Sequence, residues 1–335
     1  MASGARIASA AGDFLIRGAA GVLSPAGQSG RLSIAIFHRV LCEQDDIFPD
    51  EIDRASFDDI CGWLAAWFNV LPLDAAVERL QQGTLPARAL AITFDDGYAD
   101  NHDVALPILR SHGLCATFFI ATGHLDGGRM WNDTVIEAVR RCTALELDLN
   151  GLGLLGEQRW ALNSPADRRV AIDALLPAVK YLPSATRQEV VDRIAERAGA
   201  DLPRSLMMNS SQVRAMSSAG MQIGAHTVSH PILARVDDDV AMREMMGSKG
   251  QLEDILGHPV SLFAYPNGRP GVDYSERDVA LARRVGFHAA VTTAAGAARA
   301  GDDVFQLPRF TPWDRGRMKF GVRMLRNLYD ARSSR

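Results

Sequence analysis

Four side chains that can bind a metal or move a proton occur in two short stretches, more than a hundred residues apart. Asp95 and Asp96 follow the apolar run Ala91–Phe94, and His226 and His230 follow a second apolar run. Two imidazoles and one carboxylate leave coordination positions open on a borderline divalent metal, whereas closed structural sites use four protein ligands, mostly Cys and His. A metal with open positions suits hydrolysis. The remaining aspartate is then a candidate general base.

Each stretch by itself also has an ordinary structural interpretation. An Asp-Asp-Gly sequence after a strand commonly forms a turn whose aspartates accept hydrogen bonds from the backbone, and two histidines four residues apart are commonly unrelated. Here both stretches follow a hydrophobic strand and end in a turn residue, Gly97 or Pro231. Because α/β barrels carry their ligands at the carboxyl ends of strands, the combination favours one shared site.

Short β-rich runs alternate with helical patterns along the chain, which is typical of parallel βα units and predicts an α/β protein. We expect strands at Leu32–Phe37, Ala89–Phe94, Cys115–Ala121, Met221–Ala225, Leu262–Tyr265 and Ala289–Thr293, with a weaker one at Phe305–Leu307. We expect helices at Phe57–Phe68, Asp74–Gln81, Ala105–Ser111, Ser211–Ser218, Val240–Leu256 and Ser275–Val285. Several of these helices end at a glycine, the usual stop signal.

Residues from about 132 to about 203 interrupt this alternation and have little strand character. Ser164 followed by Pro165 is a hydroxyl cap before a first-turn proline, which predicts the start of one helix. A second helix is expected from Ala185 to Arg197. Insertions in barrels accumulate in the loops of the C-terminal face, so this helical insertion is a candidate roof over the site.

Composition limits the classes of function. With 335 residues, 47% hydrophobic and 23% charged, the chain can form one large domain or two small ones. A net charge of -4 and a pI near 6.1 argue against a nucleic-acid partner. The cysteines contain no Cys-x-x-Cys pair, which excludes a zinc ribbon or thioredoxin-type motif. We expect buried thiols in a reducing compartment at Cys42, Cys61, Cys115 and Cys142.

The N-terminal segment, residues 1–31, has helical apolar spacing and predicts an amphipathic helix. Arg6, Asp13 and Arg17 interrupt its apolar stretch, so no signal peptide is predicted. Residues 313–335 contain seven basic and two acidic residues and predict a basic C-terminal helix with an apolar stripe. No run of eighteen apolar residues predicts a membrane span. We therefore expect a cytoplasmic protein, and for the terminal helices both packing on the barrel and peripheral contact with the inner membrane stay open.

Three motifs resemble those of a known family. Thr93–Gly97 and His226–His230 are similar to the first two motifs of the polysaccharide deacetylases, also called carbohydrate esterase family four or NodB-homology enzymes, and Phe263–Gly268 is similar to the third. The motifs occur in the family's order, and the likeness runs over residues 32–312. This resemblance implies a distorted (β/α)7-type TIM-like barrel carrying the helical insertion.

The resemblance also implies roles for the four polar side chains. Asp96, His226 and His230 would hold a divalent metal, and Asp95 would take the proton from the attacking water. The charge of the metal would keep Asp95 ionised at neutral pH. Zinc is the leading metal, and cobalt, nickel or manganese are compatible with two imidazoles and a carboxylate.

The third motif predicts a turn beside the reacting carbonyl. By resemblance, the backbone N–H of Asn267 would point at the oxygen that becomes negative, a contact worth ~3 kcal/mol, and an ordinary Pro-Asn-Gly turn is the alternative. Tyr265 and Pro266 are predicted to contact the substrate. Trp131 is either an aromatic platform for a sugar ring or an anchor for the insertion.

The chain departs from the commonest family pattern at two places. Ala264 stands where many relatives have an arginine that orients the catalytic aspartate, and our hypothesis is that Arg309 replaces it, with a buried structural arginine as the alternative. No histidine follows His288, so a late Leu-x-His motif is missing. His38, after the aromatic Phe37, resembles the aromatic-His pair of the exopolysaccharide deacetylase subgroup. We predict that His38 protonates the leaving amine, with a satisfied core histidine as the alternative.

These residues predict a metal-dependent hydrolase that removes an N-acetyl group from a sugar in a polysaccharide, oligosaccharide or glycan precursor. A NodB-like hydrolase of small cyclic amides is the first alternative. A non-catalytic carbohydrate-binding homologue is the second, but such a protein should have lost Asp95 or a ligand, and this chain retains both. The sequence gives neither the sugar nor the oligomeric state.

Overall fold

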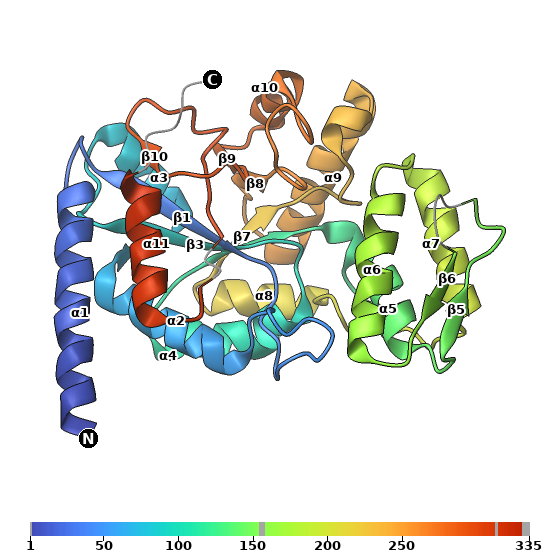
Figure 1. The fold of residues 1–335 in the computed structure, drawn as a ribbon. Helices are drawn as coiled ribbons and strands as arrows, with labels where there is room; N and C mark the ends of the chain where they lie inside the picture. Colours follow the sequence, from blue (N-terminus) through green and yellow to red (C-terminus); the bar gives the residue numbers. More distant parts are fainter. Residues whose placement is uncertain (1, 154–157, 312–313, 330–335) are drawn as a thin grey trace.

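The computed structural model describes residues 2–153, 158–311 and 314–329, with side chains from residue 12 onward. A curled sheet forms its centre, with the strand order β10-β1-β3-β4-β7-β8-β9 and β2 also paired to β3. The strands are β1 (Arg31–Phe37), β2 (Asn69–Val70), β3 (Ala89–Phe94), β4 (Thr117–Ile120), β7 (Gln222–Ala225), β8 (Leu262–Ala264), β9 (Ala289–Val291) and β10 (Ala298–Arg299). Every pairing is parallel except that of β1 with β10. The predicted α/β barrel is thereby confirmed as a distorted half-barrel (Figure 1).

Helices follow the strands as predicted, and all but the one at Leu73–Gln82 cover the outside of this sheet. They are α2 (Arg54–Trp67), α3 (Leu73–Gln82), α4 (Leu106–Ser111), α8 (Ser210–Ser218), α9 (Asp238–Leu256) and α10 (Glu276–Val285). Gly257 ends α9 in the left-handed conformation, which is the expected glycine stop. Asn209 and Gln212 form a capping box at the start of α8, a signal that we had not predicted.

Successive residues of each strand face opposite sides of the sheet, which produces two apolar cores. On β1, Leu32 and Ile34 join an inner core that fills the barrel, whereas Ala35 and Phe37 join an outer core beneath the helices. Because both faces are buried, the strands are almost continuously apolar, as expected for parallel strands.

The weaker strand expected at Phe305–Leu307 is not formed. Instead, an irregular segment runs between β9 and β1: Leu307 makes a single bridge to Val291, and Phe310 makes one to Ala35. The segment is too irregular for a ladder, yet it is fixed to both strands. It closes the gap between them and holds Arg309 at a defined place.

The insertion forms a compact lobe beside the barrel (Figure 1, green). It contains α5 (Trp131–Arg141), β5 (Glu146–Asp148), β6 (Arg159–Ala161), α6 (Pro165–Lys180) and α7 (Ser184–Ala198) around its own apolar core. The two expected helices are present, and the side chain of Ser164 caps α6. The lobe has little strand structure, as expected, and what the described residues contain is the short antiparallel pair of β5 and β6. Strands of three residues are too short to show a periodic pattern.

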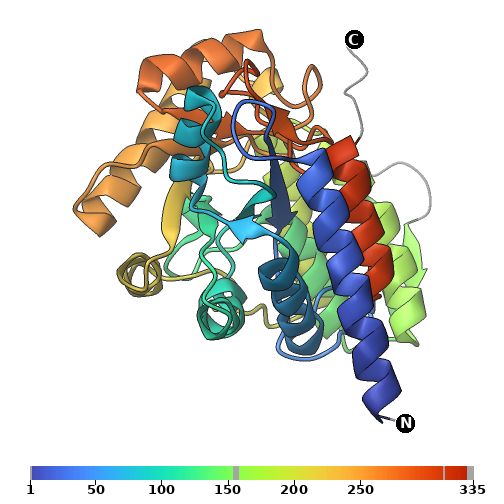
Figure 2. The same cartoon turned by 90° about the vertical axis from the view of Figure 1, so that its left-hand side faces the viewer.

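The terminal helices α1 (Ala2–Leu23) and α11 (Arg317–Tyr329) lie side by side against the barrel (Figures 1 and 2). Phe320 is buried, and its ring lies 5.3 Å from that of Trp63 on α2. Asp13 of α1 accepts a hydrogen bond from Trp67 Nε1 at 2.9 Å and pairs with Arg317 at 2.6 Å. The described parts of both helices therefore pack on the barrel.

Membrane contact by the terminal helices stays a prediction. Phe14, Leu15 and Val22 of α1 are exposed on the face turned away from the barrel. Among the residues described, no helix has the length and apolar content to cross a bilayer. The predicted domain boundary at 312/313 falls outside the described residues.

The expectation of buried cysteines was only partly correct. Cys61 and Cys142 are buried, Cys115 is half-buried, and Cys42 is exposed. All four are free thiols. Cys42 follows β1 and the apolar residues Val40 and Leu41, so the local sequence did not indicate that its side chain is exposed.

The packing of α11 can be tested by truncating its central aromatic side chain. We expect Phe320→Ala to lower the free energy of unfolding by about 3–5 kcal/mol, because a buried ring is removed from a site enclosed by two tryptophans. Val322→Ala on the exposed face of the same helix is the control, expected within ~0.5 kcal/mol of the wild type. Urea unfolding followed by tryptophan fluorescence measures both. Equal midpoints for the two variants would contradict the packing described above.

Candidate active site

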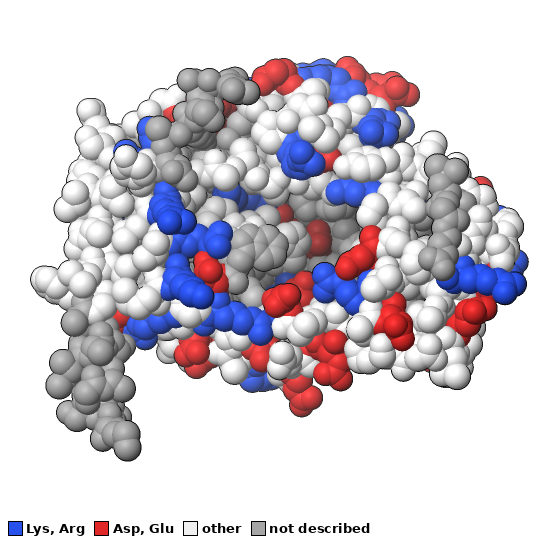
Figure 3. Space-filling view, in the orientation of Figure 1, with Lys and Arg blue, Asp and Glu red and all other residues white. Residues whose placement is uncertain are grey.

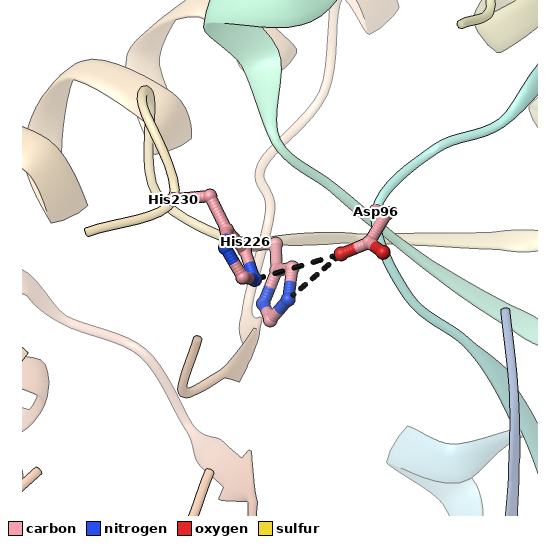
Figure 4. A group of neighbouring side chains, drawn as sticks. All are labelled: Asp96, His226 and His230. Atoms are coloured by element: carbon pink, nitrogen blue, oxygen red, sulfur yellow. Dashed lines mark ion pairs between the residues drawn. The ribbon is translucent and has the colours of Figure 1, made fainter. Parts of the chain in front are cut away.

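Asp96, His226 and His230 converge at the carboxyl end of the sheet (Figure 4). The Nε2 atoms of His226 and His230 lie 3.5 Å and 3.6 Å from Asp96 Oδ1. One ligand atom from each of the three residues lies within 4.8 Å of the others. The predicted metal ligands, separated by 130 residues in the chain, are therefore brought together.

The backbone around these ligands is held in unusual conformations. Asp96 and His230 have φ values of 77° and 54°, in the left-handed region that side chains other than glycine rarely adopt. Gly97, with φ of 90°, completes the sharp turn after β3. Strained backbone at several site residues is typical of positions where geometry serves function.

The loop between the two histidines is fixed by Glu244 of α9. Its Oε2 accepts hydrogen bonds from the backbone N–H groups of Val228 and Ser229, both at 2.8 Å, and its Oε1 accepts one from the Ser229 hydroxyl at 2.7 Å. Sequence reasoning missed Glu244. Nothing in the motif pointed to it, because it lies within an ordinary amphipathic helix pattern.

The three side chains fit a divalent cation. Two ligands at about 2.1 Å from a tetrahedral metal lie about 3.4 Å apart, close to the distances found between the histidines and Asp96. His226 Nδ1 donates to the Ala264 carbonyl at 2.8 Å, which leaves Nε2 directed at Asp96. A hydrogen bond of this kind commonly orients a metal-binding imidazole.

The electrostatics of the cluster also favour a cation. Burial alone would raise the pKa of Asp96, but the histidines beside it lower that pKa overall. Burial, helped by the neighbouring His226, lowers the pKa of His230 to about 3 and keeps it neutral, the form that binds metals. Burial would lower the pKa of His226, but the hydrogen bond to Asp96 and the charge of Asp95 raise that pKa overall. The two carboxylates therefore stabilise positive charge at this position.

Asp95 and Arg309 form a buried bidentate ion pair. Arg309 Nη1 lies 2.7 Å from Asp95 Oδ1, and Nη2 lies 2.7 Å from Oδ2. Arg309 also donates through Nε to the Thr292 carbonyl at 2.9 Å and through Nη1 to the Thr93 hydroxyl at 3.1 Å. The structure thus places Arg309 against Asp95, as our hypothesis required.

This pairing controls the charge of Asp95. Burial would raise the pKa of Asp95, but Arg309, together with His226, lowers it overall. Asp95 is therefore held as a carboxylate, the form that a general base needs. The fork of Arg309 also fixes the orientation of that carboxylate.

His38 lies at the end of β1 and lines the same cavity as Asp95. Its side chain is exposed, so the alternative of a satisfied core histidine is wrong. The preceding Phe37 is buried and stacks on Phe94 at 5.3 Å, which anchors the strand end.

A cavity of about 530 Å³ opens over the site. The centre of Figure 3 shows the hollow. Trp131 lines it and also packs on Arg187 at 5.1 Å, so it both faces the site and anchors the insertion. Part of the wall comes from Leu176, Pro177 and Lys180 of helix α6 and from Tyr181 just after it, none of which the sequence predicted at the site. The insertion therefore does border the site.

The predicted substrate contacts from the third motif need a correction. Tyr265 is fully buried and stacks on Tyr274 at 4.0 Å in the outer core, and Pro266 is also buried. Neither lines the cavity among the described residues. The alternation along β8 turns Tyr265 away from the site, a direction that the motif alone did not reveal. Asn267 does line the cavity, with φ of 58°.

Thr293 positions the Asn267 turn and was also missed. Its hydroxyl donates to the Asn267 carbonyl at 2.9 Å, and its backbone N–H donates to the Gly268 carbonyl at 2.9 Å. Gly268 has φ of 69°, and a Cβ there would lie 2.9 Å from the Thr293 nitrogen, so only glycine fits this close approach.

Comparison with known proteins agrees with this fold and site. Residues 82–145 and 185–290, just over half of the chain, match the family model for polysaccharide deacetylases. YxkH of Bacillus subtilis (strain 168), whose description assigns it to the polysaccharide deacetylases, is 20% identical over 281 residues, covering 83% of this chain and 70% of the relative. The unmatched residues between the two parts fall in the insertion.

Solved structures show the same fold. The deacetylase PplD of Streptococcus pyogenes, solved in complex with acetate, aligns with a TM-score of 0.54 and 21% identity, over 84% of this chain and 92% of that one. IcaB from Ammonifex degensii aligns with a TM-score of 0.56 and 18% identity, over 89% and 98%. The chain belongs to the polysaccharide deacetylase family, and the family supports an enzyme that deacetylates polysaccharide.

The influence of Arg309 on Asp95 has a measurable pH signature. In Arg309→Met, burial of Asp95 is no longer opposed by the guanidinium, so its pKa should rise. Because only the ionised base is active, the acid limb of the kcat/KM profile should move to higher pH, by about 1–3 units. Arg309→Lys keeps the positive charge but cannot make both guanidinium hydrogen bonds to Asp95, so the acid limb should move by a smaller amount.

The free energy of unfolding should depend on pH in the same direction as the activity. A carboxylate whose folded-state pKa is lowered stabilises the fold above its unfolded pKa, and this contribution is lost as the pH falls through the folded value. Circular dichroism should show that Arg309→Met is folded at neutral pH before its activity is compared. An unchanged acid limb in folded Arg309→Met would show that Arg309 does not set the ionisation of Asp95.

Proposed function

We propose that this protein is a metal-dependent N-deacetylase that hydrolyses the acetamido group of an N-acetylated sugar in a glycan or glycan precursor. The observation that carries the proposal is the juxtaposition of the Asp96, His226 and His230 cluster with a separate buried aspartate, Asp95, in one open cavity. Amide hydrolysis needs an activated water, a polarised carbonyl and a proton for the amine. The cavity has a candidate group for each.

Asp96, His226 and His230 are the residues that would hold the cation. When bound there, a divalent ion polarises the acetyl carbonyl and lowers the pKa of a water molecule. Zinc suits two imidazoles and a carboxylate best, and cobalt, nickel or manganese are also compatible.

Asp95 accepts the proton of the attacking water. Arg309 keeps it ionised and fixes its direction, so Arg309 is a positioning residue in this scheme. The backbone N–H of Asn267, at the edge of the cavity, donates to the carbonyl oxygen as its negative charge develops. His38, across the cavity, gives a proton to the departing amine.

Acetate release tests the proposal directly. Incubated with a panel of N-acetylated glycans, the wild-type protein should release acetate, and stripping with dipicolinate should abolish this until Zn²⁺ is restored. We expect Asp95→Asn to lower kcat by about 10²–10⁴-fold, the usual contribution of a general base, while retaining bound metal. His230→Ala is the matched variant and should lose the metal itself. Acetate release that persists in the stripped protein would contradict metal dependence.

The role of His38 can be separated from a structural role by changing the leaving group. An amine must be protonated as it departs, whereas 4-nitrophenolate leaves unaided. We expect His38→Ala to lose about 10²-fold or more in kcat on the acetamido sugar but little on 4-nitrophenyl acetate. Equal losses on both substrates would assign His38 to structure or binding instead of proton donation.

A further inference from the structure

A second cavity, of about 720 Å³, adjoins the catalytic one. Thr293 lines both cavities, and Arg309, which pairs with Asp95 on the catalytic side, lines the second. One wall of the second cavity is helix α11. A molecule with its acetamido group at Asp95 would therefore pass Thr293 to reach α11.

The α11 wall is basic. Lys319, Arg323 and Arg326 occupy positions i, i+4 and i+7, which lie on one face of a helix, and all three line the cavity and are exposed. Figure 3 shows basic side chains gathered over α11 beside the central hollow. The protein as a whole carries a net charge of -4, so this concentration of positive charge is a local feature.

Among the residues that the structure describes, one carboxylate neutralises part of this charge. Asp314 pairs with Arg323. Within the described ranges, neither Lys319 nor Arg326 has a carboxylate partner. The packing of α11 does not depend on them, because the opposite face of the helix is the buried one, with Phe320 and Met324. Two cations thus line the cavity with no ion-pair partner among residues 12–153, 158–311 and 314–329 and with no packing role.

We propose that this second cavity binds the phosphate groups of a substrate in which the acetamido sugar is linked through a diphosphate ester. The inference rests on the proposed function, since it places the sugar at Asp95. Guanidinium and ammonium groups bind phosphate oxygens through charge-assisted hydrogen bonds. A diphosphate diester carries two negative charges, which match the charges of Lys319 and Arg326. A neutral glycan would leave both cations without a partner.

Exposed apolar side chains accompany the basic face. Met318 and Val322 are exposed, line the same cavity and lie beside Lys319 on α11. They offer an apolar surface to whatever group the diphosphate carries on its far side. The same phosphate chemistry occurs in nucleoside diphosphate sugars and in polyprenyl diphosphate sugars, and the experiment distinguishes the two.

The test compares three acetamido substrates: UDP-N-acetylglucosamine, a polyprenyl diphosphate N-acetylglucosamine in detergent, and neutral chitotetraose. For whichever phosphorylated substrate the wild type prefers, the double variant Lys319→Glu/Arg326→Glu should lower kcat/KM by about tenfold or more, because two charge-assisted contacts are reversed. Its kcat/KM on chitotetraose should stay within about twofold. The wild-type preference should weaken as salt is added.

The control variant makes the same charge change elsewhere. Arg214→Glu/Arg284→Glu alters two exposed arginines on α8 and α10 and should leave the preference for phosphorylated substrate intact. Preference for UDP-N-acetylglucosamine identifies a nucleotide carrier, and preference for the polyprenyl substrate identifies a lipid carrier. Equal loss in both double variants would overturn the inference, as would a wild type that prefers neutral or carboxylated oligosaccharides.

The inference and the proposed function can fail separately. Release of acetate from chitotetraose alone supports the function and overturns the phosphate site. If none of the substrates releases acetate, the function fails, and the site is judged by calorimetric titration of metal-stripped protein with UDP-N-acetylglucosamine. Binding that weakens about tenfold in Lys319→Glu/Arg326→Glu supports the site. Binding that is absent, or equal in both proteins, overturns it.

Discussion

Asp95 and Asp96 are consecutive carboxylates at the end of β3, and both are almost fully buried. Burying two adjacent negative charges is costly unless each finds positive charge nearby. The fold meets this constraint from two sides. Asp95 is paired with Arg309, and Asp96 faces His226 and His230. Both carboxylates are thereby held ionised. In our proposal the roles follow from the partners, since Asp95 acts as the base and Asp96 shares a cation with the histidines.

The supply of Arg309 depends on how the barrel closes. A regular strand between β9 and β1 would continue the ladder, but here the irregular segment is bridged to Val291 at Leu307 and to Ala35 at Phe310. Between these two fixed points the guanidinium is anchored by Thr292 and Thr93 as well as by Asp95. The cation that many relatives place on the strand of Ala264 is thus delivered by the closing segment. The irregular closing segment and the ionised state of Asp95 are therefore linked through Arg309.

Elements outside the sheet complete the site without contributing any of its four predicted reactive side chains. Glu244 of α9 fixes the histidine loop, α6 of the insertion forms one wall of the cavity, and α11 forms a wall of the adjoining basic cavity. These parts differ in what they can control. The loop anchor governs ligand geometry, whereas the insertion and the terminal helix govern which molecules reach it. In our proposal, specificity therefore resides in the parts of the chain that lie outside the family motifs.

The sequence by itself determined the alternation of strands and helices, most of their limits, and the set Asp95, Asp96, His226 and His230. Hydrophobic periodicity, caps and turn residues are encoded within a few neighbouring positions, so these features can be read locally. The tertiary structure alone decided that Arg309 meets Asp95 across 214 positions of the chain, that Tyr265 turns into the outer core, and that α11 presents cations to a second cavity. Such contacts depend on strand register, barrel closure and helix docking, and these are properties of the assembled sheet and not of any short segment.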